Sequence, residues 1–309
     1  MGWRSVIIAN PAQLTLKDHA LVVEQNDHRA RVMLEDISVV LLEHAQVTLT
    51  VPLLSALAEH QIAVLTVNAA HLPNGVLLPY AQHSRALRVQ RAQLALSRPN
   101  QKRVWQRLVH QKVSNQAAVL DICGEATVAK KLWRDASRVR SGDPDNIEAQ
   151  SARRYFPALF GADFTRSDGR FFNHALNYGY AVCRGAIARS VAAFGFLPAF
   201  GVGHRSEQNA FNLADDLLEP FRPLVDLLVA RSYSQEPDGG LSVEDKAQLV
   251  QILHQDIQLS SDGGRVERCS VLAAMEAVAK SLSRIIVKKL PPETLALPRA
   301  EPGAGASRS

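Results

Sequence analysis

The apolar residues of this 309-residue chain change their spacing near residue 81, and this change constrains the fold more than any other feature. Before residue 81, short runs rich in Val, Ile, Leu and Thr alternate with turn residues, a pattern typical of strands. After it, apolar residues recur at the three- and four-residue spacing of helices. The sequence therefore predicts an α+β protein, with a small β-rich domain over 1–80 and a mainly α-helical domain over 81–290.

The individual elements follow from the same patterns. We expect strands over 3–9, 13–16, 20–25, 29–34, 38–42, 47–50, 62–67 and 76–80. One short helix should begin at Pro52, and later helices should cover 84–97, 99–122, 126–138, 172–196, 206–219, 242–255 and 271–289. A further helix should hold Glu148 in NIEAQSARRYF (146–156), and after the segment 201–226 a helix should resume through Arg231. Residues 291–309 are rich in Pro, Ala, Gly, Ser and Arg and are predicted to be a disordered tail.

Charge is distributed unevenly along the chain. Residues 78–140 hold 13 Lys or Arg against 3 Asp or Glu, whereas the rest of the chain holds 22 against 27. Such segregation indicates a polyanionic partner, although a helix with a solvated basic face would give the same count.

Several classes of protein are not supported by the sequence. The three cysteines, Cys123, Cys183 and Cys269, are far apart and form no CxxC pair, which argues against a zinc ribbon or a disulfide framework and favours a reducing, cytoplasmic environment. We find no P-loop, GxGxxG or GxSxG motif, no signal peptide and no apolar run long enough to span a membrane.

The segment 201–226, GVGHRSEQNAFNLADDLLEPFRPLVD, concentrates chemically active residues. A Gly-rich turn carries His204, and a helix that Ser206 could cap leads to Asp215, Asp216 and Glu219. Pro220 predicts a bend there, because proline removes a backbone hydrogen bond. A loop histidine and helical carboxylates can hold a metal ion, but a capped surface helix with solvated acids is the alternative.

A third acid lies upstream. Glu148, in IEAQSARRYF, falls in the first turn of a helix that Asp145 or Asn146 could cap. An acid at this position stabilises the helix end through the helix dipole, so its presence alone does not establish a site.

These motifs together resemble the universal CRISPR adaptation integrases. The resemblance rests on the helix NHALNYGYAVCRG (173–185), on GVGH (201–204) and on DLLEPFRP (216–223), and it covers about residues 1–290. GVGH and EPFRP at this separation are the most specific elements, and the opening GWRSVII resembles the compact versions of type II systems.

The resemblance implies a site and a reaction. Glu148, His204 and Glu219 would be the catalytic ligands of a Mg²⁺ or Mn²⁺ ion, with Asp215 and Asp216 in accessory roles. The ion would support a metal-dependent endonuclease and integrase that joins the 3′-OH ends of short DNA duplexes to the repeat array. The basic residues expected to hold DNA phosphates are Arg153, Arg205, Arg222, Lys130, Lys131, Arg134 and Arg138.

The resemblance also implies an assembly. The β-rich domain would provide dimerisation and partner contacts, and two homodimers would join a smaller CRISPR adaptation protein in a heterohexamer on double-stranded protospacer and repeat DNA. An effector nuclease is a further candidate partner, and no membrane is involved. Two alternatives remain open: a metal-dependent nuclease that acts on branched DNA without a partner, and a non-catalytic DNA-binding scaffold.

Overall fold

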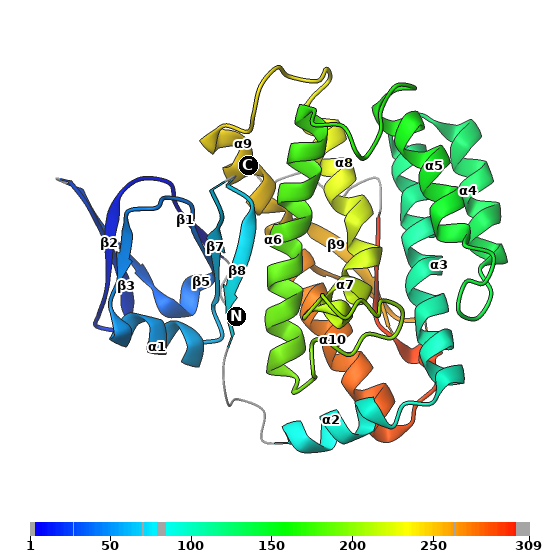
Figure 1. Cartoon of the computed structure of the whole chain (residues 1–309), viewed down its shortest axis with the longest axis horizontal. Coiled ribbons are helices and arrows are strands. Elements are labelled where there is room, and N and C mark those ends of the chain that lie inside the picture. The colour runs from blue at the N-terminus through cyan, green and yellow to red at the C-terminus, as the bar shows by residue number, and fades with distance from the viewer. Residues whose placement is uncertain (1–3, 27, 70, 79–84, 262–263, 301–309) are drawn as a thin grey trace.

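The structure, a computed structural model, describes residues 4–26, 28–69, 71–78, 85–261 and 264–300. A strand-rich N-terminal region lies beside a larger helical body, as Figure 1 shows. This arrangement confirms the predicted fold class. The element ends predicted at Trp3, Tyr80 and Ser84 lie outside the described residues.

The described residues of the N-terminal region form two sheets, one α-helix and one 3₁₀ turn (Leu34–Asp36). Its elements are β1 (Arg4–Ile8), β2 (Ala12–Lys17), β3 (Ala20–Gln25), β4 (His28–Met33), β5 (Ile37–Leu42), β6 (Val47–Leu49), α1 (Val51–Glu59), β7 (Ala63–Val67) and β8 (Pro73–Leu77). One sheet has the order β1-β5-β7-β8 and the other β4-β3-β2-β6. In the first sheet β1, β5 and β7 run parallel, and β8 is antiparallel to β7.

The two central strands β5 and β7 are buried on both faces. Successive side chains of a strand point to opposite faces. Val40 and Val64 accordingly pack with α1 and the second sheet, whereas Leu41 and Leu65 join the core of the helical body. The first sheet therefore connects the N-terminal region to the helices by a shared hydrophobic core.

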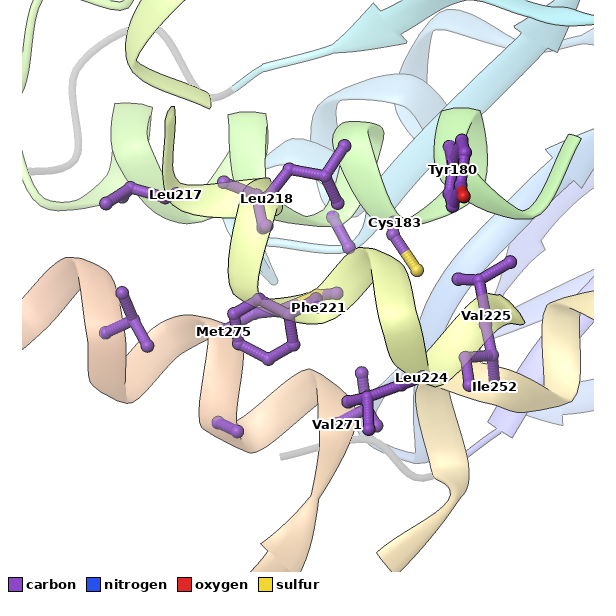
Figure 2. Packing of buried hydrophobic residues seen from close by; sticks show 14 of the residues in the cluster. Tyr180, Cys183, Leu217, Leu218, Phe221, Leu224, Val225, Ile252, Val271 and Met275 are labelled. Carbon is purple, nitrogen blue, oxygen red and sulfur yellow. The ribbon is translucent and has the colours of Figure 1, made fainter. Parts of the chain in front are cut away.

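The helical body consists of α-helices of 7 to 25 residues in the described part of the chain. Its helices are α2 (Ala86–Leu94), α3 (Arg98–Ile122), α4 (Ala126–Arg138), α5 (Ile147–Phe160), α6 (Phe171–Ala193), α7 (Asn212–Leu218), α8 (Arg222–Ser232), α9 (Val243–Val250) and α10 (Val271–Lys288). Most residues of α6 are buried, which agrees with its nearly all-round apolar sequence. Figure 2 shows Cys183 of α6, Phe221 and Met275 of α10 among the side chains of this core.

Two predicted side-chain caps are wrong. Neither Asp145 nor Asn146 caps α5: the carboxylate of Asp143 accepts from the backbone N–H groups of Ile147 (2.9 Å) and Glu148 (3.1 Å). Ser206 does not cap a helix either, because residues 206–211 form turns and α7 begins only at Asn212.

A third sheet was not predicted, and part of the predicted disordered tail belongs to it. Strands β9 (Asp256–Ser260), β10 (Val266–Ser270) and β11 (Leu297–Arg299) pair in the order β10-β9-β11. The prediction of disorder is therefore wrong for residues 291–300, where Leu297 is buried. Residues 301–309 lie outside the described part of the chain.

Candidate active site

The Gly201–His204 loop is folded around the carboxylate of Asp216. This carboxylate of α7 is fully buried and accepts from the backbone N–H groups of Val202 (2.5 Å), Gly203 (3.1 Å) and His204 (2.8 Å). A Cβ atom at Gly203 would lie 2.3 Å from the ring of Trp105, and one at Gly201 would lie 2.5 Å from the carbonyl oxygen of His204. Glycine is needed at both positions because there is no room for a side chain.

Asp216 also fixes the imidazole of His204. The Nδ1 atom of His204 lies 2.8 Å from Oδ1 of Asp216, and the ring packs edge-on against Trp105. This hydrogen bond raises the pKa of His204, and the negative charges of Glu219 and Glu148 act in the same direction. With Nδ1 engaged, Nε2 is the atom available to a ligand.

Two carboxylates from different elements meet at one buried ammonium group. Lys112 of α3 donates to Oε1 of Glu148 (2.6 Å) and to Oε2 of Glu219. Both oxygens lie within hydrogen-bond distance of the same nitrogen, so they are no more than about 6 Å apart. The structure thus brings together two of the three predicted ligands, and His204 lies near enough for their charges to act on it.

Glu219 lies at the predicted bend. Pro220 interrupts the helical path, and residues Glu219–Phe221 form a single 3₁₀ turn between α7 and α8. Nδ2 of Asn115 donates to the carbonyl oxygen of Pro220 (2.7 Å), which ties this turn to α3.

Glu219 is ionised although it is buried. Burial alone would raise its pKa, but the charges of Lys112 and Arg222 outweigh burial and hold the pKa well below its usual range. Arg222 Nε donates to Oε1 of Glu219 (2.9 Å), and the guanidinium lies over the ring of Tyr180. The hydroxyl of Tyr180 in turn donates to the buried carboxylate of Asp226.

The two predicted accessory acids have different environments. Asp216 positions the histidine loop as described above. Asp215 points elsewhere: Arg184 and Asn209 engage its two oxygens, with Arg184 Nε at 2.6 Å and Asn209 Nδ2 at 2.6 Å. Asp216 is therefore the accessory acid that contacts the site residues.

The predicted DNA-binding residues fall into two groups. One group is exposed and consists of Lys130, Lys131, Arg134 and Arg138 on α4, Arg153 on α5, and Arg205. Arg222 differs from this group because it is half-buried and paired with Glu219. Its guanidinium group is thus engaged with Glu219, one of the two acids of the site.

A cavity of about 460 Å³ opens beside His204. Arg98, Arg205 and Phe200 are among its lining residues. Phe200 is 52% exposed, so this cavity offers both positive charge and an aromatic surface next to the histidine.

The donor set fits a hard divalent cation. Carboxylate oxygens are the ligands that Mg²⁺ and Mn²⁺ prefer, and one oriented imidazole is compatible with Mn²⁺. In the described part of the chain, no three His, Cys, Asp or Glu side chains are close enough to form a complete metal cluster. Glu148, His204 and Glu219 as joint metal ligands therefore stay a prediction.

Sequence reasoning missed the role of Lys112. In the sequence it is one of several basic residues between 85 and 140, and nothing in its spacing separates it from the solvated ones. Its burial signals a special role: Lys112 is only 8% exposed, and a lysine is almost never buried unless it is paired, as Lys112 is with Glu148 and Glu219.

Comparison with known proteins identifies the family and the fold of the chain. The family model for the CRISPR associated protein Cas1 matches residues 6–237. The CRISPR-associated endonuclease Cas1 of Neisseria meningitidis serogroup C (strain 8013) is 45% identical over 293 residues, covering 94% of each chain.

Solved structures share the architecture. A casposase bound to integration product superposes with a TM-score of 0.79 at 17% identity, covering 99% of this chain and 96% of that one. A Cas1 protein from Thermotoga maritima gives a TM-score of 0.70 at 18% identity, covering 92% and 97%. The chain thus has a fold found in a Cas1 protein and in a casposase. Its match to the family model over most of its length shows that it belongs to the Cas1 family of CRISPR-associated proteins.

No helix of the described residues is long and apolar enough to cross a membrane.

Proposed function

We propose that this protein is the integrase of CRISPR spacer acquisition, a metal-dependent DNA endonuclease that joins the 3′-OH ends of short duplexes to the repeat array. The observation that carries the proposal is the pair of carboxylates, Glu148 and Glu219, that share one cationic partner beside an oriented histidine. Membership of the Cas1 family and the endonuclease name of the Neisseria relative support it.

The residues of the chain have distinct parts in this reaction. Glu148, His204 and Glu219 would hold a Mg²⁺ or Mn²⁺ ion, which when bound supplies Lewis-acid stabilisation of phosphate charge. Asp216 keeps Nδ1 of His204 occupied, so that Nε2 would be the atom that holds the ion. Arg98 and Arg205, at the cavity beside His204, would bind the phosphates of the entering DNA strand.

The exposed basic residues of α4 extend the DNA surface. Lys130, Lys131 and Arg134 carry no ion pair in the described structure and are free to contact the phosphate backbone. Affinity for duplex DNA should therefore fall steeply as the salt concentration rises.

The proposed assembly is the one that the resemblance to the family implies. We infer that the protein forms a homodimer and acts with a smaller adaptation protein in a heterohexamer on protospacer and repeat DNA. A stand-alone nuclease on branched DNA would instead show full activity without the small partner.

Strand transfer into a supercoiled plasmid that carries a repeat array tests the proposal. With Mn²⁺ and the small partner, Glu219→Gln and Glu148→Gln should each lower the rate by at least about 1000-fold, because several kcal/mol of transition-state stabilisation depend on the ion. Glu244→Gln, an exposed acid at the start of α9, is the matched control and should keep the wild-type rate.

Circular dichroism and thermal melting should show that the two site variants are folded. Wild-type strand transfer by a folded Glu219→Gln protein would refute the assignment, and the absence of any metal-dependent DNA chemistry in the wild type would favour the scaffold alternative.

A further inference from the structure

Lys112 is a buried cation in the middle of the 25-residue helix α3, at the point where Glu148 and Glu219 meet. Charged groups are costly to take out of water, and replacing a whole buried ion cluster with apolar residues is often neutral or stabilising, although removing one partner alone is destabilising. A lysine at this position therefore calls for an explanation other than fold stability.

The atoms around Lys112 show what its charge balances. Two carboxylates within about 6 Å of one another repel, and in a buried site this repulsion would favour protonation of one of them. The ammonium of Lys112 contacts one oxygen of each acid and removes that repulsion. The second oxygen of Glu219 is held separately by Arg222.

Lys112 and Arg222 differ in how firmly they are held. Arg222 lies over the ring of Tyr180 with its guanidinium 4.7 Å from the ring centre, and its Nε donates to Glu219. Lys112 contacts both acids through a single nitrogen at the end of a flexible stem. The ammonium can therefore move aside while Arg222 stays in place.

We propose that Lys112 is a built-in counter-cation, which holds Glu148 and Glu219 together in the metal-free protein and gives up both carboxylates when a divalent cation binds. This inference rests on the metal site proposed above. It makes metal affinity the outcome of a competition, because the ion has to displace a charge that already occupies the space between the two acids. It also explains why the acids are preorganised before the ion arrives.

The competition predicts opposite effects of Lys112→Met on the metal-free and metal-bound protein. In EDTA the variant should melt at a lower temperature than the wild type, because the buried Glu219 and the half-buried Glu148 lose their shared partner. Mn²⁺ should restore this loss and raise the melting temperature of Lys112→Met by more than it raises that of the wild type.

Isothermal titration of the full-length protein with Mn²⁺ measures the competition directly. Lys112→Met should bind Mn²⁺ at least about tenfold more tightly than the wild type, since removing a unit charge so near the donor oxygens has a large Coulomb effect. Lys102→Met removes an exposed lysine of the same helix and should leave the affinity unchanged. Lys112→Arg keeps the charge and should not reproduce the gain.

Equal or weaker Mn²⁺ binding by Lys112→Met, or an equal thermal shift, would overturn the inference. If Glu219→Gln abolishes binding while Lys112→Met binds no more tightly, only the role of Lys112 fails. A wild-type protein that binds no Mn²⁺ overturns the proposed metal site as well.

A second measurement applies if Lys112→Met does not fold in EDTA. In wild-type protein labelled with ¹³C at the lysine ε-carbon, Mg²⁺ should move the signal that Lys112→Arg removes. A Lys112 signal that stays unchanged at saturating Mg²⁺ contradicts displacement.

Discussion

Asp226 of α8 is a carboxylate whose charge the surrounding core disfavours. It is 1% exposed, and burial raises its pKa from 3.8 to about 6, although the hydrogen bond from Tyr180 acts in the opposite direction. The folded protein therefore holds this proton more tightly than the unfolded chain does. Between pH 4 and pH 6 the contribution of Asp226 to stability falls as the pH rises.

Asp226→Asn should remove this pH dependence. At pH 7 the raised pKa corresponds to a penalty of about 3 kcal/mol in the free energy of unfolding, and the penalty is nearly absent at pH 4. We expect the variant to gain stability relative to the wild type as the pH rises from 4.5 to 7. Urea denaturation of both proteins across this range measures the difference. If the two free energies of unfolding change in parallel with pH, the pKa of Asp226 is not raised.

Some residues of the site could be predicted from the sequence, and others could not. Glu148, His204 and Glu219 stand in motifs that resemble a known family, so they could be named without a structure. Lys112 could not, because its role depends on burial between α5 and the turn at Glu219, which lies 107 residues further along the chain. The structure was also needed to distinguish the roles of Asp215 and Asp216. Adjacent helical residues point in different directions, and the sequence does not say which of the two faces the site.

Helix α3 organises the elements around the acid pair through Asn115. This residue is 2% exposed, and its Nδ2 donates to the carbonyl oxygens of Pro220 (2.7 Å) and Pro298 (3.0 Å). Its Oδ1 accepts from the backbone N–H of Ala300 (3.1 Å). One side chain thus connects α3, the turn at Glu219 and the chain at β11.

Asn115→Leu should lower the free energy of unfolding by at least about 3 kcal/mol, because it leaves buried backbone groups without partners at about 1–3 kcal/mol each. Gln111→Ala is the matched control one turn earlier, since Gln111 donates only to Oδ1 of Asn115 and should cost about 1 kcal/mol. Denaturant unfolding compares the two. Equal losses would mean that Asn115 does not bridge these elements.

The helices were easier to predict than the third sheet for a physical reason. Helical spacing repeats over many residues, so α3, α4 and α10 were found with ends within about two residues, the usual scatter of helix boundaries. Strands β9 (DIQLS) and β10 (VERCS) hold only two apolar residues each, so their sequences show no apolar run that would predict a strand. β11 contains Pro298, which suggested a disordered tail but is compatible with a strand at the edge of a sheet.

At the scale of the whole molecule, the strand-rich region and the helical body are joined more closely than the boundary near residue 81 suggested. Glu43 accepts from the hydroxyl of Tyr178 (2.6 Å) and from Nζ of Lys246 (2.8 Å), so a residue that follows β5 pairs with α6 and α9. A Cβ atom at Gly185 of α6 would lie 2.4 Å from Leu65 of β7. The division into domains 1–80 and 81–290 stays a prediction, and these contacts show that the described parts of both share an interface.

The candidate site is built from elements that lie far apart in the sequence. Its three predicted ligands come from α5, from the loop before α7 and from the turn after it, and α3 supplies the cation that joins two of them. The central claim is that these side chains hold one divalent cation that drives DNA strand joining.

Electron paramagnetic resonance of Mn²⁺ tests this claim most directly, because free and protein-bound ions give different signals. The account predicts one bound Mn²⁺ per chain in the wild type, and at least about 100-fold weaker binding in each of Glu148→Ala, His204→Ala and Glu219→Ala. Wild-type Mn²⁺ binding by any of these variants in its folded form would contradict it.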